Sequence, residues 1–195
     1  MWRRAGIGPA TPRAVRHIPP MTNAAGTFPP PRFLVVMGVS GAGKTTVGRA
    51  LARALGWPFH EGDAYHPAAN VERMARGQPL TDEDRAPWLA ALHDLIARSL
   101  ASGEHGVLAC SALRERYRAA LVPASAPAGT VRFVFLDVPA EVLRARLEHR
   151  AGHYMPPSLL PSQLRTLEPP RDALRVDGTE PPDAIVRVVR STLGL

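Results

Sequence analysis

Two residue types are almost missing from this chain of 195 residues, which has one cysteine and one lysine. The single cysteine, Cys110, excludes an internal disulfide and is consistent with a reducing compartment such as the cytoplasm. Because Cys110 follows the apolar residues 107–109, we expect a buried structural thiol and not a nucleophile. The single lysine, Lys44, stands among 23 arginines, so the bias toward arginine has not reached this position.

Long apolar runs and a basic surface are also lacking. No stretch approaches the roughly 20 apolar residues of a membrane span, so we expect a soluble protein with no membrane partner. The formal net charge is +7, but residues 1–32 contribute +5 of it, through five arginines and no acidic residue. The remainder is nearly balanced and does not interleave basic with aromatic residues, so we expect no nucleic-acid partner.

The first residues differ in composition from the rest. Residues 1–31 contain seven prolines and few large apolar side chains, which predicts a disordered, dispensable extension. The prolines oppose an amphipathic transit peptide, and the segment lacks the apolar core of a secretory signal. Residues 32–195 have the length of one α/β domain.

The most informative stretch is 38–45, GVSGAGKT, which matches the phosphate-loop pattern GxxxxGK[ST] at every position. Its glycines let successive backbone N–H groups point inward at phosphate oxygens. Lys44 reaches the β- and γ-phosphates, and the Thr45 hydroxyl is placed to ligate Mg²⁺. We therefore predict a nucleotide site formed by Gly38, Val39, Ser40, Gly41, Ala42, Gly43, Lys44, Thr45 and Thr46.

The surroundings of the loop fit this prediction. The apolar run 32–37 is typical of a parallel strand buried on both faces, and Val47, Leu51 and Leu55 follow at helical spacing, up to Gly56. Further strands are expected at 57–60, 106–110, 131–136 and 174–177, separated by helices, whereas 151–170 is expected to be irregular.

Alternating strands and helices predict a three-layer α/β fold of the P-loop nucleoside-triphosphate hydrolase type, with a five-stranded parallel sheet, helices on both faces and a small lid. Ligands of such a fold bind at the carboxyl ends of the strands. The phosphate loop, Asp63, Ser111 and Asp137 all fall there.

A phosphate loop indicates a nucleotide but not a reaction. A GTPase switch reads guanine with an NKxD segment, which cannot exist here because Lys44 is the only lysine. A motor ATPase ends a strand with an acidic pair, and Asp137 is either a magnesium residue of that kind or a turn residue. A small-molecule kinase needs a carboxylate at the acceptor and a basic lid, for which Asp63 and a lid at about 144–170, with Arg144, Arg146 and Arg150, are suitable.

Four further segments carry a family resemblance. They are GDxxHPxxNxxRMxxGxPLxDxDRxPWL at 62–89, CSALRxxYR at 110–118, RxxHYM at 150–155 and SQxxxLEP at 162–169. They closely resemble the gluconate kinases of the phosphate-loop type, relatives of shikimate and adenylate kinases, over about residues 33–190. The resemblance implies transfer of the γ-phosphoryl group of ATP, with Mg²⁺, to the 6-hydroxyl of D-gluconate, and it also implies a homodimer. Arg73 and Tyr154 stand where lysine and phenylalanine are common in that family.

The resemblance also suggests roles for single residues. Lys44, Asp63 and Arg150 are the predicted catalytic residues: Asp63 orients or deprotonates the acceptor hydroxyl, and Arg150 either neutralises phosphoryl charge or is a solvated helix-end arginine. Arg85 either binds the carboxylate or pairs with Asp82 or Asp84. The full predicted substrate-binding set is Asp63, His66, Asn70, Arg73, Arg85 and Ser111.

Some alternatives remain open at this stage. For His66, Asn70 and Ser111, the alternative to substrate contact is a purely structural role. The remaining histidines lack metal-ligand spacing, so a metal site built from them is not expected. For the whole chain, the rivals are a kinase for another small anion, such as shikimate or a nucleoside monophosphate, and a nucleotide-binding module without turnover.

Overall fold

A computed structural model describes residues 30–149 and 157–195. The predicted extension therefore lies, up to residue 29, outside the described residues. The same is true of Arg150, His153, Tyr154 and Met155. Within the described ranges no helix is both long and apolar enough to cross a membrane.

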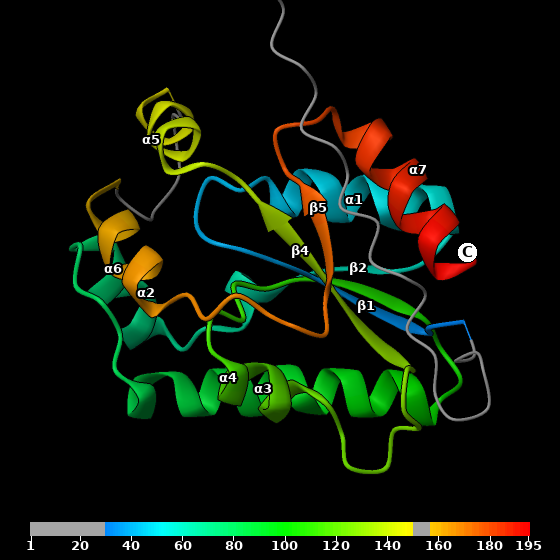
Figure 1. Cartoon of the computed structure of the whole chain (residues 1–195). Helices are drawn as coiled ribbons and strands as arrows, with labels where there is room; N and C mark the ends of the chain where they lie inside the picture. Colours follow the sequence, from blue (N-terminus) through cyan, green and yellow to red (C-terminus); the bar gives the residue numbers. More distant parts are fainter. Residues whose placement is uncertain (1–29, 150–156) are drawn as a thin grey trace, which may run out of the picture.

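Five parallel strands form a single sheet in the order β2-β3-β1-β4-β5 (Figure 1). Their bounds are β1 Phe33–Met37, β2 Phe59–Glu61, β3 Gly106–Ala109, β4 Val131–Asp137 and β5 Leu174–Asp177. This confirms the predicted fold class. The central strand, β1, is completely buried along its length, as its continuous apolar run predicts.

Helices cover both faces of the sheet (Figure 1). On one face lie α1, Lys44–Leu55, and α7, Pro182–Leu193, while on the other lie α3, Asp82–Ala101, and α4, Glu115–Leu121. Alternate residues of β1 divide between the two cores: Leu34 and Val36 pack toward α1 and α7, and Phe33 and Val35 pack toward α3 and α4. The period of two along each strand thus builds two hydrophobic layers.

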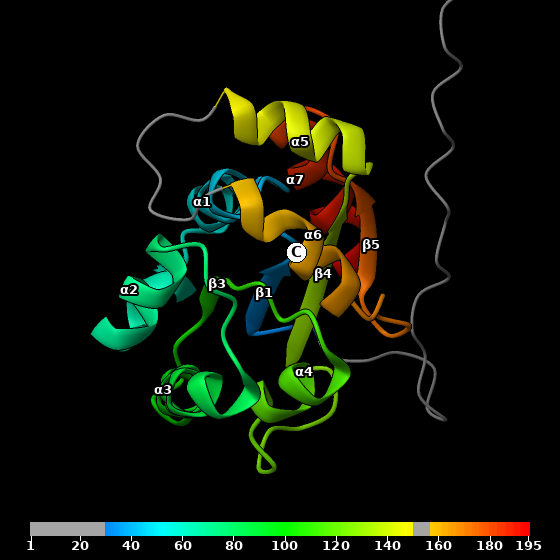
Figure 2. The ribbon, with the colours of Figure 1, turned by 90° about the vertical axis from the view of Figure 1, so that its left-hand side faces the viewer.

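The remaining helical segments gather beyond the carboxyl ends of the strands, at the left of Figure 1 and in the foreground of Figure 2. They are the 3₁₀ turn η1, Gly62–Tyr65, then α2, Ala68–Ala75, α5, Ala140–Glu148, the 3₁₀ turn η2, Pro157–Leu159, and α6, Leu160–Thr166. Met74, Leu80 and Leu159 form a small separate apolar cluster that joins this layer together.

The expectation that 151–170 is irregular is wrong for α6. Its Pro161 stands in the first turn, where a missing N–H costs nothing, so the proline does not oppose the helix. Leu160 is buried, and the segment is fixed by a hydrogen bond from the Glu168 N–H to the Leu113 carbonyl, 2.8 Å long. Packing against distant residues, and not local preference, makes this helix.

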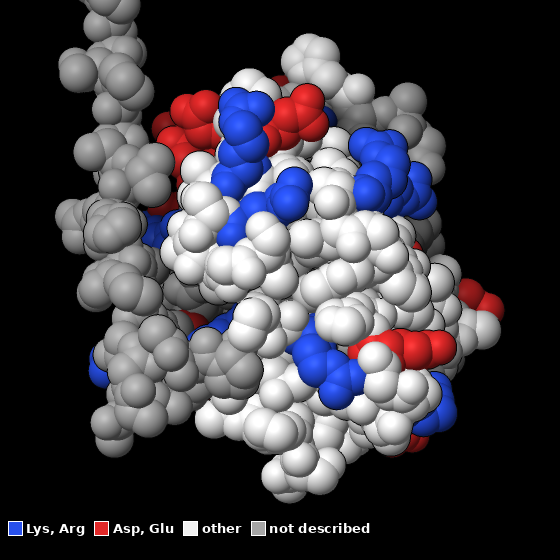
Figure 3. All heavy atoms as spheres, turned by 90° about the vertical axis from the view of Figure 1, so that its right-hand side faces the viewer, with Lys and Arg blue, Asp and Glu red and all other residues white. Residues whose placement is uncertain are grey.

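The face that Figure 3 shows is mostly uncharged, with basic and acidic side chains in a few small groups that partly adjoin one another. It offers no continuous basic stripe among the described residues drawn there. Such a stripe is the usual electrostatic footprint of a nucleic-acid-binding surface.

Candidate active site

A cavity of about 350 Å³ lies at the carboxyl ends of the strands. It joins the phosphate loop to η1, to the beginning of α3 and to the β5–α7 loop. Most of the predicted site residues line it, namely Ser40, Gly41, Ala42, Gly43, Lys44, Thr45, Thr46, Asp63, His66, Arg85 and Ser111. The chain thus brings the predicted nucleotide residues and the predicted acceptor residues into one space.

The phosphate loop has the backbone that its glycines predict. Gly43 has φ 97° and stands immediately before α1, so the loop turns into the helix through a left-handed residue. Gly38 has φ 145°, and a Cβ there would lie 3.2 Å from the Leu136 carbonyl oxygen. The Lys44 ammonium donates a 3.0 Å hydrogen bond to the Val39 carbonyl, which holds it across the loop. The positive end of α1 is therefore open to an anion in the cavity.

Glu61 is a site residue that the sequence analysis did not select. It ends β2 and lines the cavity, and its carboxyl lies near enough to the Thr45 hydroxyl for that group to favour the charged form. Burial raises the pKa of the Glu61 carboxyl, and the charge of Asp63 raises it further. Two carboxylates two residues apart at a strand end were the signal available in the sequence. Carboxylate and hydroxyl oxygens are the donors that Mg²⁺ prefers, so Thr45 and Glu61 together fit that ion.

Asp63 and His66, two of the predicted acceptor residues, lie on and just after η1 and line the cavity. The His66 ring stacks on the Trp88 indole, with centroids 4.4 Å apart and planes inclined by 11°. Burial is the main cause that lowers the pKa of His66 to about 4, so the imidazole is neutral at pH 7. Its Nδ1 is buried without a hydrogen-bond partner among the described residues, which leaves a polar atom for a ligand to satisfy.

Arg85 enters the cavity from the first turns of α3. Its Nη1 donates to the Leu80 carbonyl at 2.7 Å and to the Thr81 carbonyl at 3.2 Å, and its guanidinium carbon lies 5.6 Å from the centre of the Tyr117 ring. The described residues supply no ion pair to Arg85, so the pairing with Asp82 or Asp84 considered above is not formed. The Arg85 guanidinium thus lines the cavity without a carboxylate partner among the described residues.

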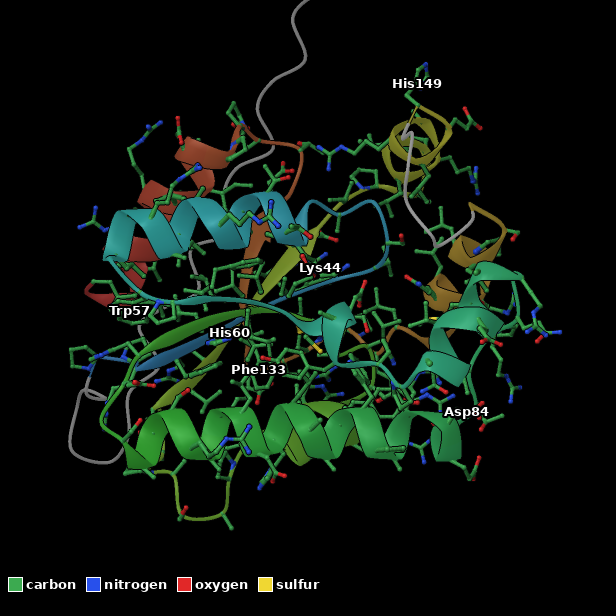
Figure 4. All side chains as sticks on the ribbon, turned by 180° about the vertical axis from the view of Figure 1, so that it is seen from behind. Lys44, Trp57, His60, Asp84, Phe133 and His149 are labelled. Carbon is green, nitrogen blue, oxygen red and sulfur yellow. The ribbon has the colours of Figure 1, made fainter. Side chains whose placement is uncertain are left out.

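Asn70 and Arg73 are placed differently, because neither lines the cavity. The Asn70 side chain is buried and donates a 2.6 Å hydrogen bond to the Asp84 carbonyl, while Arg73 pairs with the Asp84 carboxylate at 3.2 Å. Both therefore fasten α2 to the beginning of α3. Figure 4 shows Lys44 where α1 begins and Asp84 where α3 begins, so the cavity is framed by helices from opposite faces of the sheet. Substrate contact by Asn70 and Arg73 stays a prediction.

The three predicted lid arginines differ in how the structure describes them. Arg146 lines the cavity and donates to the Gly41 and Ala42 carbonyls, at 3.4 Å each, and to the Gly178 carbonyl at 3.0 Å. Arg144 is exposed, and Arg150, the predicted catalytic arginine, lies outside the described residues. Arg146 thus ties the phosphate loop to the β5–α7 loop, a position that the sequence analysis gave only as one of three lid arginines.

Ser111 follows β3, and its carbonyl accepts a 3.4 Å hydrogen bond from the Gly38 N–H. The next residue, Ala112, has φ 44°, a left-handed conformation that is costly for alanine and directs the chain away at this point. Asp137, by contrast, is bound by Arg175 at 2.6 Å and does not line the cavity. Among the described residues, no group of three or more histidine, cysteine or acidic side chains could hold a metal.

Comparison with known proteins agrees with this geometry. The family model described as an AAA domain matches residues 33–170. The chain is 55% identical to a gluconokinase of Gluconobacter oxydans over 159 residues, which cover 80% of this chain and 88% of that protein.

Two solved structures are similar throughout. A gluconokinase from Sinorhizobium meliloti superposes with a TM-score of 0.74 at 48% identity, covering 85% of this chain and 93% of that one. A sugar kinase from Janibacter superposes with a TM-score of 0.77 at 43% identity, covering 85% and 95%. The chain belongs to the gluconokinase family.

Proposed function

We propose that this protein transfers the γ-phosphoryl group of ATP to the 6-hydroxyl of D-gluconate, which gives 6-phospho-D-gluconate and ADP. The observation that carries the proposal is the single cavity that joins the phosphate loop to Asp63, His66 and Arg85. Both the predicted nucleotide residues and the predicted acceptor residues line this one cavity. This is the arrangement that in-line transfer between two bound substrates requires.

The protein binds the nucleotide at two places, at its phosphates and at its nucleoside. In this proposal the loop N–H groups and Lys44 bind the β- and γ-phosphates. Arg146, Gly178 and Glu180 also line the cavity, and we place the nucleoside against them. Thr45, with Glu61 beside it, would hold Mg²⁺ with the phosphates. When bound, this ion neutralises the charge that develops on the phosphate oxygens.

The acceptor side suits an anionic polyol. The Arg85 guanidinium is a planar donor for a carboxylate, and the unsatisfied Nδ1 of neutral His66 is a hydrogen-bond partner for a hydroxyl. Ser111 and the Tyr117 hydroxyl add further polar contacts. Met74, Leu80 and Trp88 provide the apolar surface on which the carbon chain rests.

In the reaction, Asp63 orients the 6-hydroxyl and accepts its proton as the oxygen attacks the γ-phosphorus. The bond between that phosphorus and the β–γ bridging oxygen breaks, and ADP departs with the bridging oxygen. Lys44 of the phosphate loop and Arg146, which contacts the loop, neutralise the charge spread over the transferring group. Arg150 completes this set in our proposal.

The test is a coupled ADP-release assay with ATP and Mg²⁺ and a panel of D-gluconate, other sugar acids, shikimate and nucleoside monophosphates. We expect turnover with gluconate, reduced about 10²-fold or more in Asp63→Asn because the base is lost. Asp94→Asn, the same change at an exposed position of α3, is the matched control. Turnover confined to another acceptor would refute the substrate, and binding of ATP without any turnover would refute the kinase. The homodimer stays a prediction, which sedimentation analysis would test.

A further inference from the structure

One hydrogen bond at the phosphate loop comes from a remote part of the chain. The backbone N–H of Ser40 donates to Oε1 of Gln163, on α6, at 2.6 Å across 123 residues of sequence. Ser40 is the third residue of the loop and is 7% exposed. A side-chain oxygen thus satisfies a loop amide that faces the cavity.

This hydrogen bond lies on the acceptor side of the loop. Gln163 lines the main cavity and also a second one of about 210 Å³, whose wall includes Leu80, Arg85 and Thr166. Gly178 and Glu180, from the β5–α7 loop, also line the main cavity, and the proposed function places the nucleoside against them. A triphosphate that extends from the nucleoside end toward Asp63 therefore brings its terminal phosphoryl group closest to Ser40 and Gln163.

A phosphoryl oxygen and Oε1 are both acceptors, and the single Ser40 N–H serves one of them well. The Gln163 carboxamide, however, also carries two N–H donors on Nε2. Its χ3 torsion has broad, roughly two-fold preferences, so the group can turn to exchange Oε1 and Nε2. We propose that Gln163 binds the γ-phosphoryl group of ATP directly. In the structure its Oε1 accepts the hydrogen bond of the Ser40 amide. When ATP binds, the phosphoryl group takes that amide and the turned carboxamide donates Nε2–H to the same group.

The placement of α6 supports this role. Leu159 and Leu160 are buried at its beginning, and just beyond its end the Glu168 carboxylate accepts a 2.7 Å hydrogen bond from the Glu115 N–H. Gln163 therefore lies on a helix that is held in place by contacts with α4 and by its buried leucines. Gln163 would therefore contact the terminal phosphate from the side of the cavity where the proposed acceptor binds. This inference rests on the proposed phosphoryl transfer.

The test compares ligands that differ only in the terminal phosphate. The dissociation constants of ADP and of the β,γ-imido analogue of ATP, each with Mg²⁺, are measured by calorimetry without gluconate. In Gln163→Glu we expect the analogue to be weakened at least about tenfold more than ADP, because a carboxylate would face the γ-phosphoryl group. Gln163→Met, of similar shape without donor or acceptor, should lower kcat about 10²-fold and leave ADP affinity within about threefold. Arg165→Ala, exposed on the same helix, should change neither quantity.

A purely structural contact gives a different result. If both Gln163 variants change the affinities of ADP and of the analogue by the same factor, with a matching fall in Tm, Gln163 only anchors α6 and the proposal is wrong. Because the binding measurements need no acceptor, they remain decisive even where the wild-type protein does not phosphorylate gluconate. That second failure would appear in the turnover assay alone.

Discussion

The indole Nε1 of Trp88 donates a buried 2.8 Å hydrogen bond to the carbonyl oxygen of Gly62. Trp88 lies in the middle of the α3 packing layer, 1% exposed, and Gly62 begins the η1 turn that presents Asp63. A core side chain thus fixes the backbone one residue before the proposed base. Because the same indole also supports the His66 ring, packing and catalytic geometry are set by one residue.

Replacement of Gly62 by alanine should damage both stability and activity. A Cβ at this position would lie 2.5 Å from the Ala109 carbonyl oxygen, a backbone atom that cannot move without disturbing β3. We expect a loss of about 1–3 kcal/mol in the free energy of unfolding, from overpacking, together with a lower kcat because Asp63 shifts. Urea unfolding and the turnover assay measure the two effects. Ala64→Ser, at the exposed next-but-one residue, should alter neither, and a fully stable Gly62→Ala would show that η1 is not held tightly.

His66 should make the protein acid-sensitive over a defined range. Its pKa is about 4 in the folded protein and near 6.5 when unfolded, so the unfolded chain binds the extra proton first. Stability linked to His66 is complete above about pH 6.5 and falls as the pH drops toward 4. Compared with His66→Phe, which keeps the stack on Trp88, the wild type should lose about 1–3 kcal/mol over this range, the upper value being reduced by partial exposure. Urea unfolding of the two proteins at pH 7.5 and 4.5 measures this effect. If the difference between their free energies of unfolding is the same at both pH values, the lowered pKa of His66 is wrong.

Arg85 should control acceptor affinity more than turnover. In Arg85→Met we expect KM for gluconate to rise about 10- to 100-fold, the equivalent of a lost charge-assisted hydrogen bond, with a smaller change in KM for ATP. Arg85→Lys keeps the charge without the planar guanidinium, so its KM for gluconate should lie between those of the wild type and Arg85→Met. Arg98→Met, an exposed arginine on the same helix, is the control. Equal increases in both KM values would instead indicate that Arg85 supports the loop through the Leu80 and Thr81 carbonyls.

Cys110 should be chemically inert in the native protein. Its side chain is fully buried, and burial raises the pKa of the thiol to about 12, so almost no thiolate is present at pH 8. Ellman's reagent should therefore release no colour from the folded protein and one equivalent after denaturation. Rapid labelling under native conditions would show that β3 opens locally. The structure confirms the buried position predicted from the sequence.

The strands and the phosphate loop could be predicted because their signals are local. The five strands lie where they were expected, although β2 begins at Phe59 and not at Trp57. Gly56 ends α1 with φ 66°, as expected of a helix C-terminal glycine. The order of the strands in the sheet carries no local signal, since neighbours are decided by packing across the whole chain.

The site was predictable only in part, for the same reason. Asp63 and Arg85 could be selected from their motif, and both line the cavity. Asn70 and Arg73 belong to the same motif, yet their side chains turn to Asp84, because the spacing along α2 does not say which partner lies opposite. Glu61 and Gln163 gain their importance from contacts with Thr45 and Ser40, and these long-range contacts exist only once the chain has folded.

The position of β1 in the centre of the sheet has a consequence for how the protein is made. β1 pairs with β3 and with β4, and the β4 residue opposite Met37 is Phe135. The phosphate loop follows β1 directly, yet the strands that hold it in place are synthesised about 70 to 100 residues later, since β3 begins at Gly106 and β4 at Val131. A chain released early would carry the complete GVSGAGKT sequence without the framework that shapes it. ATP should therefore protect only chains extended beyond β4, so nucleotide binding would report completed synthesis of the sheet centre.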